Sequence, residues 1–228
     1  MIQEIMQIPQ LDILTLSSAG LLIATFAVVV RRGFMDWLSA YRYQTMVLAA
    51  ATAVIAYSTG IWEIYVAAAL TLVIKAVIIP KVLLRVTRKI KDEFKTETNP
   101  YVSLRLSVLI SALLVTLSYA LTQQMLSTSS LDSVTMTYLP VSVSLFFIGL
   151  FVMVSRRMAL SQVVGLLIIE NGLFLFTTAL THGVSLIIEI GIFADILVGV
   201  VISAILLFRI SQTFDTLDIG SLEKLRDD

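Results

Sequence analysis

The sequence predicts an all-α protein, a polytopic membrane helix bundle with about seven transmembrane helices. Of its 228 residues, 58% are hydrophobic and only 14% are charged, whereas soluble domains usually carry about 25% charged residues. The mean hydropathy is +0.95, and the apolar residues gather in runs close to the length of about 20 residues that a helix needs to cross a bilayer. We therefore expect the protein to be embedded in a lipid bilayer.

Seven apolar segments qualify as spanning helices, namely residues 11–30, 44–59, 61–80, 104–125, 135–154, 158–180 and 185–208. The second segment is short and rich in alanine, and the turn residues Ser58, Thr59 and Gly60 predict a tight hairpin between it and the third. A polar stretch, 85–101, ends where Pro100 disfavours helix at the residue before it. This stretch divides the chain into an N-terminal module of three helices and a basic loop (1–100) and a C-terminal part of four helices (101–228).

All but one of the 16 Lys and Arg residues fall into four groups along the chain. The groups lie between the first and second segments, between the third and fourth, between the fifth and sixth, and after the seventh. With seven spans, all four groups lie on one side of the membrane, and the other side has acidic residues and one histidine. The positive-inside rule then predicts that the N-terminus is outside and that the C-terminus and the basic loop are cytoplasmic.

The composition argues against several kinds of chemistry. The chain has no cysteine and a single histidine, His182, which leaves no ligand set for a thiolate metal site, an iron–sulfur cluster or a haem. The formal net charge is zero, so the charge gives no support for nucleic acid as a partner. There is also no phosphate-binding glycine loop and no nucleophile–histidine arrangement. We expect no cofactor and no active site within this chain.

Four ionisable residues interrupt the apolar segments: Lys75, Glu170, Glu189 and Asp195. Charged groups inside a bilayer are costly and are usually retained for a function. If His182 marks a turn, a rise of about 1.5 Å per residue places Glu170 roughly 18 Å and Asp195 roughly 19 Å from it, at matched depth near the midplane. Glu189 lies about 10 Å from the same turn, and Lys75 lies about 21 Å from the outer end of the third segment.

These positions predict a lateral chain of titratable groups across the membrane midplane, along which protons move between side chains and water. A carboxylate suits this task because burial favours its protonated form and a nearby lysine favours its charged form. A lysine that approaches or withdraws can therefore load and unload the acid. Asn171, Thr177, Thr178 and Ser203 are candidates for holding the water.

Structural roles are the alternatives. Glu170 and Asp195 can instead be hydrogen-bonded across a helix interface, and Glu189 can contact a partner subunit. Lys75 can extend its long side chain to the cytoplasmic surface. Four glycines are expected to let helices pack closely: Gly165, Gly172, Gly191 and Gly199.

The stretch 141–228 resembles the small three-helix K-type subunit of respiratory complex I, a family that also includes the C-type subunit of multisubunit cation/proton antiporters. Four motifs carry the resemblance in this order: LFFIGLFVMVSRRM, VVGLLIIENGLFL, IFADILVGVVISAILLFRI and the tail TLDIGSLEKLRDD. The family usually has a membrane-embedded glutamate in each of its last two helices, and Asp195 occupies the position of the second.

The first of these glutamates is displaced in this sequence. The family's glutamate usually follows a Gly-Leu pair directly, whereas Leu167 follows Gly165 and Leu166 here, and Glu170 comes three residues later. Three residues are nearly one helical turn, so Glu170 stays on a similar face. The resemblance therefore extends to Glu170 by face and depth and not by aligned position.

Four additional helices before the K-like module (about 135–228) are similar to component E of hydrogenase-4-type complexes, which are energy-converting [NiFe] hydrogenases related to complex I. This resemblance implies a multi-pass, non-catalytic subunit of a prokaryotic inner membrane. It would contact other membrane subunits, including antiporter-like ones, and contribute acids to a proton or ion pathway coupled to redox chemistry. The alternatives are a subunit of an antiporter-like assembly without a redox partner and a structural scaffold.

Overall fold

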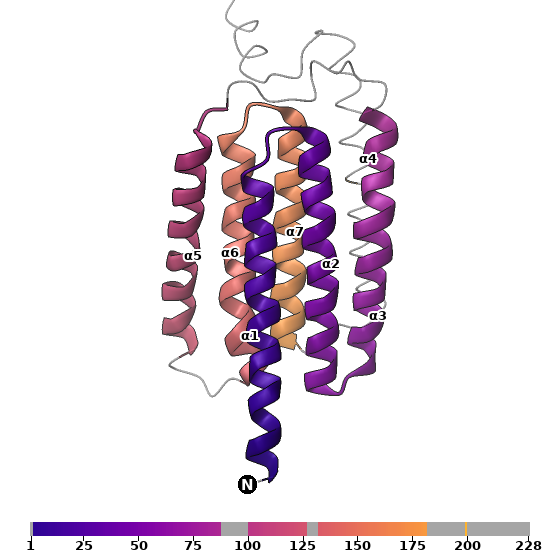
Figure 1. The fold of residues 1–228 in the computed structure, drawn as a ribbon, viewed down its shortest axis with the longest axis vertical. Coiled ribbons are helices and arrows are strands. Elements are labelled where there is room, and N and C mark those ends of the chain that lie inside the picture. Colours follow the sequence, from indigo (N-terminus) through magenta and orange to yellow (C-terminus); the bar gives the residue numbers. More distant parts are fainter. Residues whose placement is uncertain (1, 88–99, 127–131, 182–198, 200–228) are drawn as a thin grey trace, which may run out of the picture.

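The computed structural model describes residues 2–87, 100–126, 132–181 and 199, and in these stretches the protein is helical with no strand (Figure 1). In chain order, the elements are α1 (Ile2–Val29), α2 (Phe34–Thr59), α3 (Trp62–Leu70), the π-helical η1 (Thr71–Ile78), α4 (Ile79–Thr87), α5 (Leu104–Leu126), α6 (Ser133–Ser155) and α7 (Ala159–Thr181). The elements α3, η1 and α4 follow one another without a break. The all-α prediction is confirmed for this part of the chain.

Within the described stretches, five helical segments are long and apolar enough to cross a membrane, judged by length and composition: Asp12–Val29, Trp62–Arg85, Leu104–Gln124, Ser133–Ser155 and Ala159–Thr181. They coincide with the first, third, fourth, fifth and sixth predicted spans. The second predicted span is the C-terminal part of α2, which begins at Phe34 rather than at residue 44. The seventh, 185–208, lies outside the described residues, so the count of seven stays a prediction.

The long α2 has a simple physical origin. Phe34, Trp37, Leu38 and Tyr41 recur at three- and four-residue spacing before the predicted start, and all four are buried. This spacing places them on one helix face. The charged residues Asp36 and Arg42 lower the mean hydropathy of residues 34–43 but do not lie on that buried face. Hydropathy alone therefore places the start of the helix too late.

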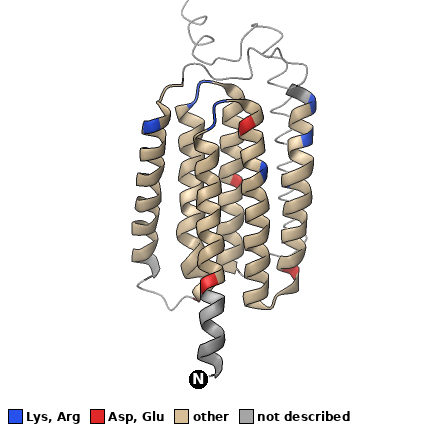
Figure 2. Cartoon of the chain, in the orientation of Figure 1, with Lys and Arg blue, Asp and Glu red and all other residues tan. Residues whose placement is uncertain are grey.

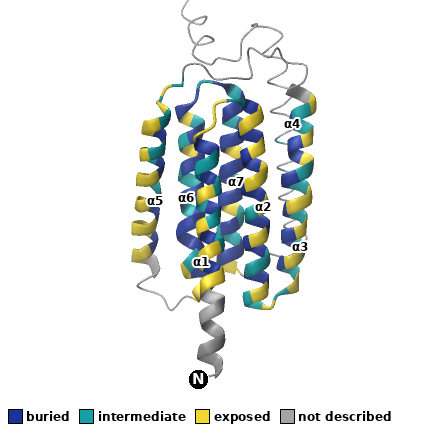
Figure 3. Cartoon of the chain, in the orientation of Figure 1, coloured by how far each residue is buried: buried dark blue, intermediate teal, exposed yellow. Residues whose placement is uncertain are grey.

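The helices run side by side, and their axes follow the long direction of the bundle (Figure 1). Helices α1, α2, α6 and α7 form the centre, where α7 packs on α6 and α2, and α1 packs on α2 and α6. Helix α5 flanks α6, and the α3–η1–α4 segment flanks α2. Figure 3 shows the buried residues concentrated on the central helices and the exposed ones on outward faces.

Two helical hairpins turn at Arg-Arg pairs, Arg31–Arg32 between α1 and α2 and Arg156–Arg157 between α6 and α7, at the same end of the bundle (Figure 1). Arg156 is buried, and its guanidinium donates a 2.6 Å hydrogen bond to the carbonyl of Val29 in the last turn of α1. The Trp37 indole donates a 2.7 Å hydrogen bond to the carbonyl of Arg31. Helix C-termini leave carbonyls without intrahelical partners. The Arg156 bond therefore ties the two hairpins together, and the Trp37 bond holds the turn between α1 and α2.

The described Lys and Arg residues lie in the half of the bundle that contains these two turns (Figure 2). We call this end of the bundle the basic end. The clustering agrees with the grouping of basic residues expected from the sequence. Which membrane side the basic end faces remains a prediction.

Glycines bring α6 and α7 into close contact. A Cβ atom at Gly165 would lie 2.9 Å from the carbonyl oxygen of Gly149, and one at Gly172 would lie 2.9 Å from that of Ser142. The predicted packing roles of Gly165 and Gly172 are confirmed, and Gly149 is a third such position that the sequence analysis missed. No described residue lies within 4 Å of the Cβ position of Gly199 and Gly191 lies outside the described residues, so the packing roles of these two glycines stay predictions.

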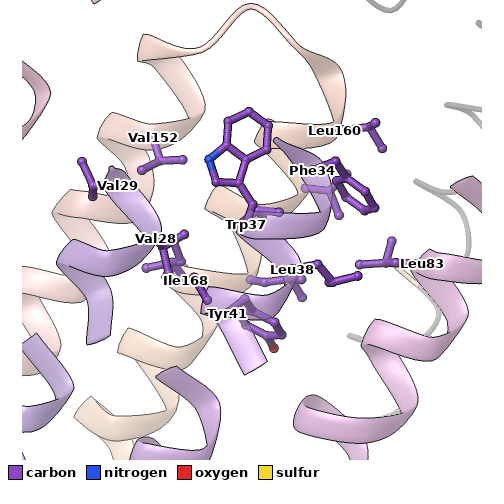
Figure 4. Close-up of a cluster of buried hydrophobic side chains, with 14 of the residues drawn as sticks. Val28, Val29, Phe34, Trp37, Leu38, Tyr41, Leu83, Val152, Leu160 and Ile168 are labelled. Atoms are coloured by element: carbon purple, nitrogen blue, oxygen red, sulfur yellow. The ribbon is translucent and has the colours of Figure 1, made fainter. Parts of the chain in front are cut away.

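The apolar core is divided into two clusters. The basic-end cluster consists of Val28, Val29, Phe34, Trp37, Leu38, Ala40, Tyr41, Ile79, Leu83, Ile148, Val152, Met158, Leu160, Val163, Val164, Leu167 and Ile168 (Figure 4). The far-end cluster consists of Leu14, Leu21, Leu48, Ala51, Ile55, Ala56, Ile64, Val134, Tyr138, Val141, Leu145, Leu175 and Ala179. In α2 and in α7 alike, a short interval of sequence separates the two clusters, and each interval contains polar residues.

Candidate functional site

A layer of polar side chains lies between the two apolar clusters. We call it the polar belt, and its members are Thr25, Gln44, Thr45, Lys75, Glu170 and Asn171. Five of them have no exposed surface, at 0% relative exposure, and the side chain of Glu170 is 13% exposed. The belt is therefore a buried polar layer inside the bundle.

A buried ion pair joins η1 to α7. The Lys75 Nζ atom lies 2.5 Å from Glu170 Oε1 and donates a 3.3 Å hydrogen bond to Asn171 Oδ1. The same ammonium lies 4.5 Å from the centre of the Phe174 ring, at a distance typical of a cation–π contact. One turn of α7 therefore surrounds the lysine head, and Lys75 does not extend to the membrane surface.

Lys75 belongs to a π-helical segment of 8 residues. In this segment the bonding changes register, as shown by the N–H of Ile79, which bonds to the carbonyl of Ile74, five residues earlier. Such π segments are rare and occur frequently at functional sites. Pro80 follows closely, and because it lacks an N–H it cannot form the α-helical bond to Ala76, which fits a register change at this point.

A chain of hydrogen bonds continues from α7 across α2 to α1. Asn171 Nδ2 donates to Gln44 Oε1 at 3.4 Å and to Thr45 Oγ1 at 3.3 Å. Gln44 Nε2 donates to Thr25 Oγ1 at 2.9 Å, and the Thr25 hydroxyl donates to the carbonyl of Leu21 at 2.8 Å. The first two bonds are long for N–H···O hydrogen bonds. The chain as a whole links four helical elements at one level of the bundle.

The structure brings together three of the five residues predicted for the pathway, namely Lys75, Glu170 and Asn171. The helix rise predicted a similar level for Lys75 and Glu170, and their direct contact confirms this within the bundle. Glu189 and Asp195 lie outside the described residues, as do His182 and Ser203, so the extension of the pathway toward them remains a prediction.

Two residues predicted to hold water form hydrogen bonds within their own helix instead. Thr177 and Thr178 donate to the carbonyls of Leu173 and Phe174 on their own helix. Conversely, Gln44, Thr45 and Thr25 were missed by the sequence analysis. The available signal was Gln44, a long amide side chain directly before the alanine-rich apolar run, but sequence alone does not show which face of α2 meets α7.

The two apolar clusters enclose the belt along the long axis of the bundle. The basic-end cluster separates it from one end of the described bundle and the far-end cluster from the other. The hydrogen bonds of the belt thus run across the bundle and not along its long axis. At Glu170 the Oε2 atom has no hydrogen-bond partner among the described residues.

Part of the sequence matches a known protein family. Residues 137–227 match the family model of NADH-ubiquinone/plastoquinone oxidoreductase chain 4L. This part of the chain is complex I K-subunit-like. It includes Glu170 and Asn171, whereas Lys75, Gln44, Thr45 and Thr25 come from the preceding helices.

The chain is also similar to curated proteins. Hydrogenase-4 component E of Escherichia coli strain K12 and that of Shigella flexneri are each 34% identical over 88 residues, which cover 39% of this chain and 41% of the relative. The alignment thus spans well under half the length of those two relatives. The uncharacterized protein Rv0085 of Mycobacterium tuberculosis is 29% identical over 211 residues, which cover 92% of this chain and 94% of that protein. No solved structure gives a significant match.

Proposed function

We propose that this chain is a non-catalytic membrane subunit of a complex I-related, energy-converting hydrogenase-type complex. In this proposal the polar belt is part of a proton or ion pathway that couples redox chemistry in other subunits to pumping. One observation carries the proposal: the buried Lys75–Glu170 pair, which Asn171 connects to Gln44 between two apolar clusters.

The energetics of the pair favour a functional role over a purely structural one. Burying two charges has a large desolvation cost, and well-packed apolar residues of similar volume are often equally stable or more stable. Charges at membrane depth are rare and usually mark pathways. A scaffold would gain little from this pair, whereas a relay needs a group that can take up and release a proton.

Each residue has a distinct proposed role. Glu170 carries the exchangeable proton, and Lys75 stabilises its charged form when the two are in contact. Asn171 connects the pair to Gln44 and orients the lysine. Asp195 and Glu189 extend the pathway beyond α7, toward antiporter-like partner subunits. Metals and clusters belong to the redox subunits of the complex.

The test uses the purified complex reconstituted into liposomes, with redox turnover and membrane potential recorded together. Glu170→Gln and Asp195→Asn keep the shape of each side chain and remove its charge. We expect an assembled complex that retains redox turnover and loses pumping. Glu63→Gln is the matched control, because Glu63 lies in the first turn of α3, away from the polar belt. Undiminished pumping in both test variants would make the two acids structural.

A related assignment is a subunit of a cation/proton antiporter-like assembly without a redox partner. The two assignments differ in the neighbouring genes. Genes for the large and small hydrogenase subunits beside the gene for this chain support the hydrogenase-type complex. Antiporter genes alone support the other assignment.

A further inference from the structure

Tyr41 has a buried hydroxyl group whose bonding the structure leaves incomplete. The side chain has 0% exposure and lies in the basic-end cluster. Figure 4 shows its ring among apolar side chains and its oxygen at the edge of the cluster, directed away from Phe34 and Trp37. The Tyr41 Oη atom makes no hydrogen bond of ordinary distance and angle to a described residue, and Thr45, one turn further along α2, is the side chain that can serve as a direct partner.

The hydroxyl is directed toward the polar belt. Tyr41 lies four residues before Thr45, so the two share one face of α2, and Thr45 accepts a hydrogen bond from Asn171. Helices α2 and α7 both start at the basic end, and a rise of about 1.5 Å per residue places Tyr41 about 6 Å nearer that end than Glu170. Helices α2 and α7 are in direct contact at this level, where Asn171, the neighbour of Glu170, bonds Gln44 and Thr45.

Two buried polar atoms that make no hydrogen bond to a described residue belong to neighbouring, packed helices: Tyr41 Oη on α2 and Glu170 Oε2 on α7. A phenylalanine would fill the place of Tyr41 without the penalty of an unpaired hydroxyl. Buried waters typically satisfy polar groups of this kind, with about three hydrogen bonds each. A bridging water is nearly as favourable as a direct hydrogen bond.

We propose that Tyr41 is a positioning residue for Glu170, which it holds by hydrogen bonding through one buried water. The phenol donates to the water, and the water donates to Glu170 Oε2. This inference rests on the proposed function and extends it, since it gives the acid two opposed partners. Lys75 holds one oxygen in the belt, and the Tyr41–water link directs the other toward the basic end.

The position of Tyr41 has a consequence for the pathway. Beyond Tyr41 toward the basic end, the neighbouring buried side chains on α2 are Leu38, Trp37 and Phe34. Tyr41 is thus the last buried residue of α2 with a hydroxyl, amide or charged group before an apolar barrier in the described structure. In this proposal, proton exchange between Glu170 and that end along α2 passes the water that Tyr41 holds.

The experiment compares two tyrosine variants of the reconstituted complex. Tyr41→Phe removes the unpaired hydroxyl. Tyr138→Phe is the matched control, because Tyr138 is equally buried but lies in the far-end cluster and shares a 2.6 Å hydrogen bond with Ser17. Infrared difference spectroscopy records the carboxyl band that disappears in Glu170→Gln, and pumping per redox turnover is measured on the same samples.

We expect Tyr41→Phe to shift the Glu170 carboxyl band, because the acid loses a hydrogen bond, and to lower pumping per turnover. Tyr138→Phe should change neither quantity. An unchanged Glu170 band in Tyr41→Phe overturns the inference, even if pumping falls. If Glu170→Gln retains full pumping, the proposed function fails, and the band comparison still decides whether Tyr41 positions the acid.

Discussion

Lys75 shows how much a single residue can determine at the centre of this bundle. Its stem crosses from η1 to α7, and its ammonium group meets a carboxylate, an amide oxygen and an aromatic ring within one turn of α7. The charge is compensated locally, which is the condition under which a lysine is tolerated at membrane depth. Removing either partner leaves the other charge buried without compensation.

This dependence gives a first prediction. Lys75→Met should lower the free energy of unfolding by about 3 to 5 kcal/mol, since breaking a buried pair leaves an uncompensated charge. Adding Glu170→Gln to Lys75→Met should recover much of that loss. Denaturant titration of the four proteins in detergent micelles, analysed as a double-mutant cycle, measures the coupling. Additive effects of the two substitutions would mean that the residues are not a pair in the folded protein.

Arg156 gives a second prediction at the same scale. It is 2% exposed, and its planar guanidinium bonds the end of α1 while lying 5.9 Å from the Trp37 ring centre. Lysine lacks the planar group and the fork of donors. Arg156→Lys should therefore cost about 1 to 3 kcal/mol of stability. Arg32→Lys, at an exposed position in the other turn, should be near neutral in the same unfolding assay, and equal losses would contradict the tie between the hairpins.

The residues of the polar belt show which features of the site can be predicted from the sequence. An acid, an amide and a lysine in apolar segments stand out by composition, and the helix rise gives their depth. Rotation about the helix axis and choice of neighbour do not follow from depth. For this reason the Lys75–Glu170 level was predictable, whereas the bond from Asn171 to Gln44 depends on how α2 packs on α7.

At the scale of elements, the interface between α6 and α7 depends on the absence of side chains. A Cβ at Gly149 would lie 2.8 Å from the backbone nitrogen of Ile169 and 2.9 Å from the oxygen of Gly165. Because both neighbours are backbone atoms, the helices themselves must move apart. Gly149→Ala should lower the free energy of unfolding by about 1 to 3 kcal/mol.

Gly20 in α1 is the matched control for this third prediction. A Cβ there would meet Val47 Cγ1 at 3.7 Å, an ordinary contact, and alanine favours a helix by up to about 1 kcal/mol over glycine. Gly20→Ala should therefore be neutral or stabilising in the same denaturant titration. A comparable loss in both variants would show that helix packing at Gly149 is not the cause.

The elements also show where prediction from sequence ends. Spacing and hydropathy predicted five of the described helical spans, because each has an apolar run of suitable length. The π-helical register of η1 was not predictable, since it depends on how the chain accommodates Lys75 and Pro80 between neighbours. The early start of α2 was also not predicted, because buried aromatic residues alternate there with charged residues that lower the hydropathy.

For the whole molecule, the distribution of charge predicts the orientation in the membrane. The two Arg-Arg turns lie at the basic end, and the tight turn at Gly60 lies at the opposite end of α2. Cytoplasmic loops of membrane proteins carry an excess of Lys and Arg. The basic end should therefore face the cytoplasm, and the turn at Gly60 should face outward.

Cysteine labelling tests this last prediction directly, because the natural chain contains no cysteine. Ser103→Cys, before α5, and Ser133→Cys, at the start of α6, are conservative changes at exposed positions on opposite ends of the neighbouring helices α5 and α6. A membrane-impermeant maleimide added to intact cells should label Ser133→Cys and spare Ser103→Cys. In inside-out vesicles the pattern should reverse.

The reversal separates orientation from simple accessibility, since each variant serves as the control for the other. Labelling of Ser103→Cys in intact cells would invert the orientation and place the basic end outside. Labelling of both variants from one side would mean that α5 does not cross the membrane, and would remove the basis for counting spans by charge. The predicted pattern would instead place the Tyr41 side of the polar belt toward the cytoplasm.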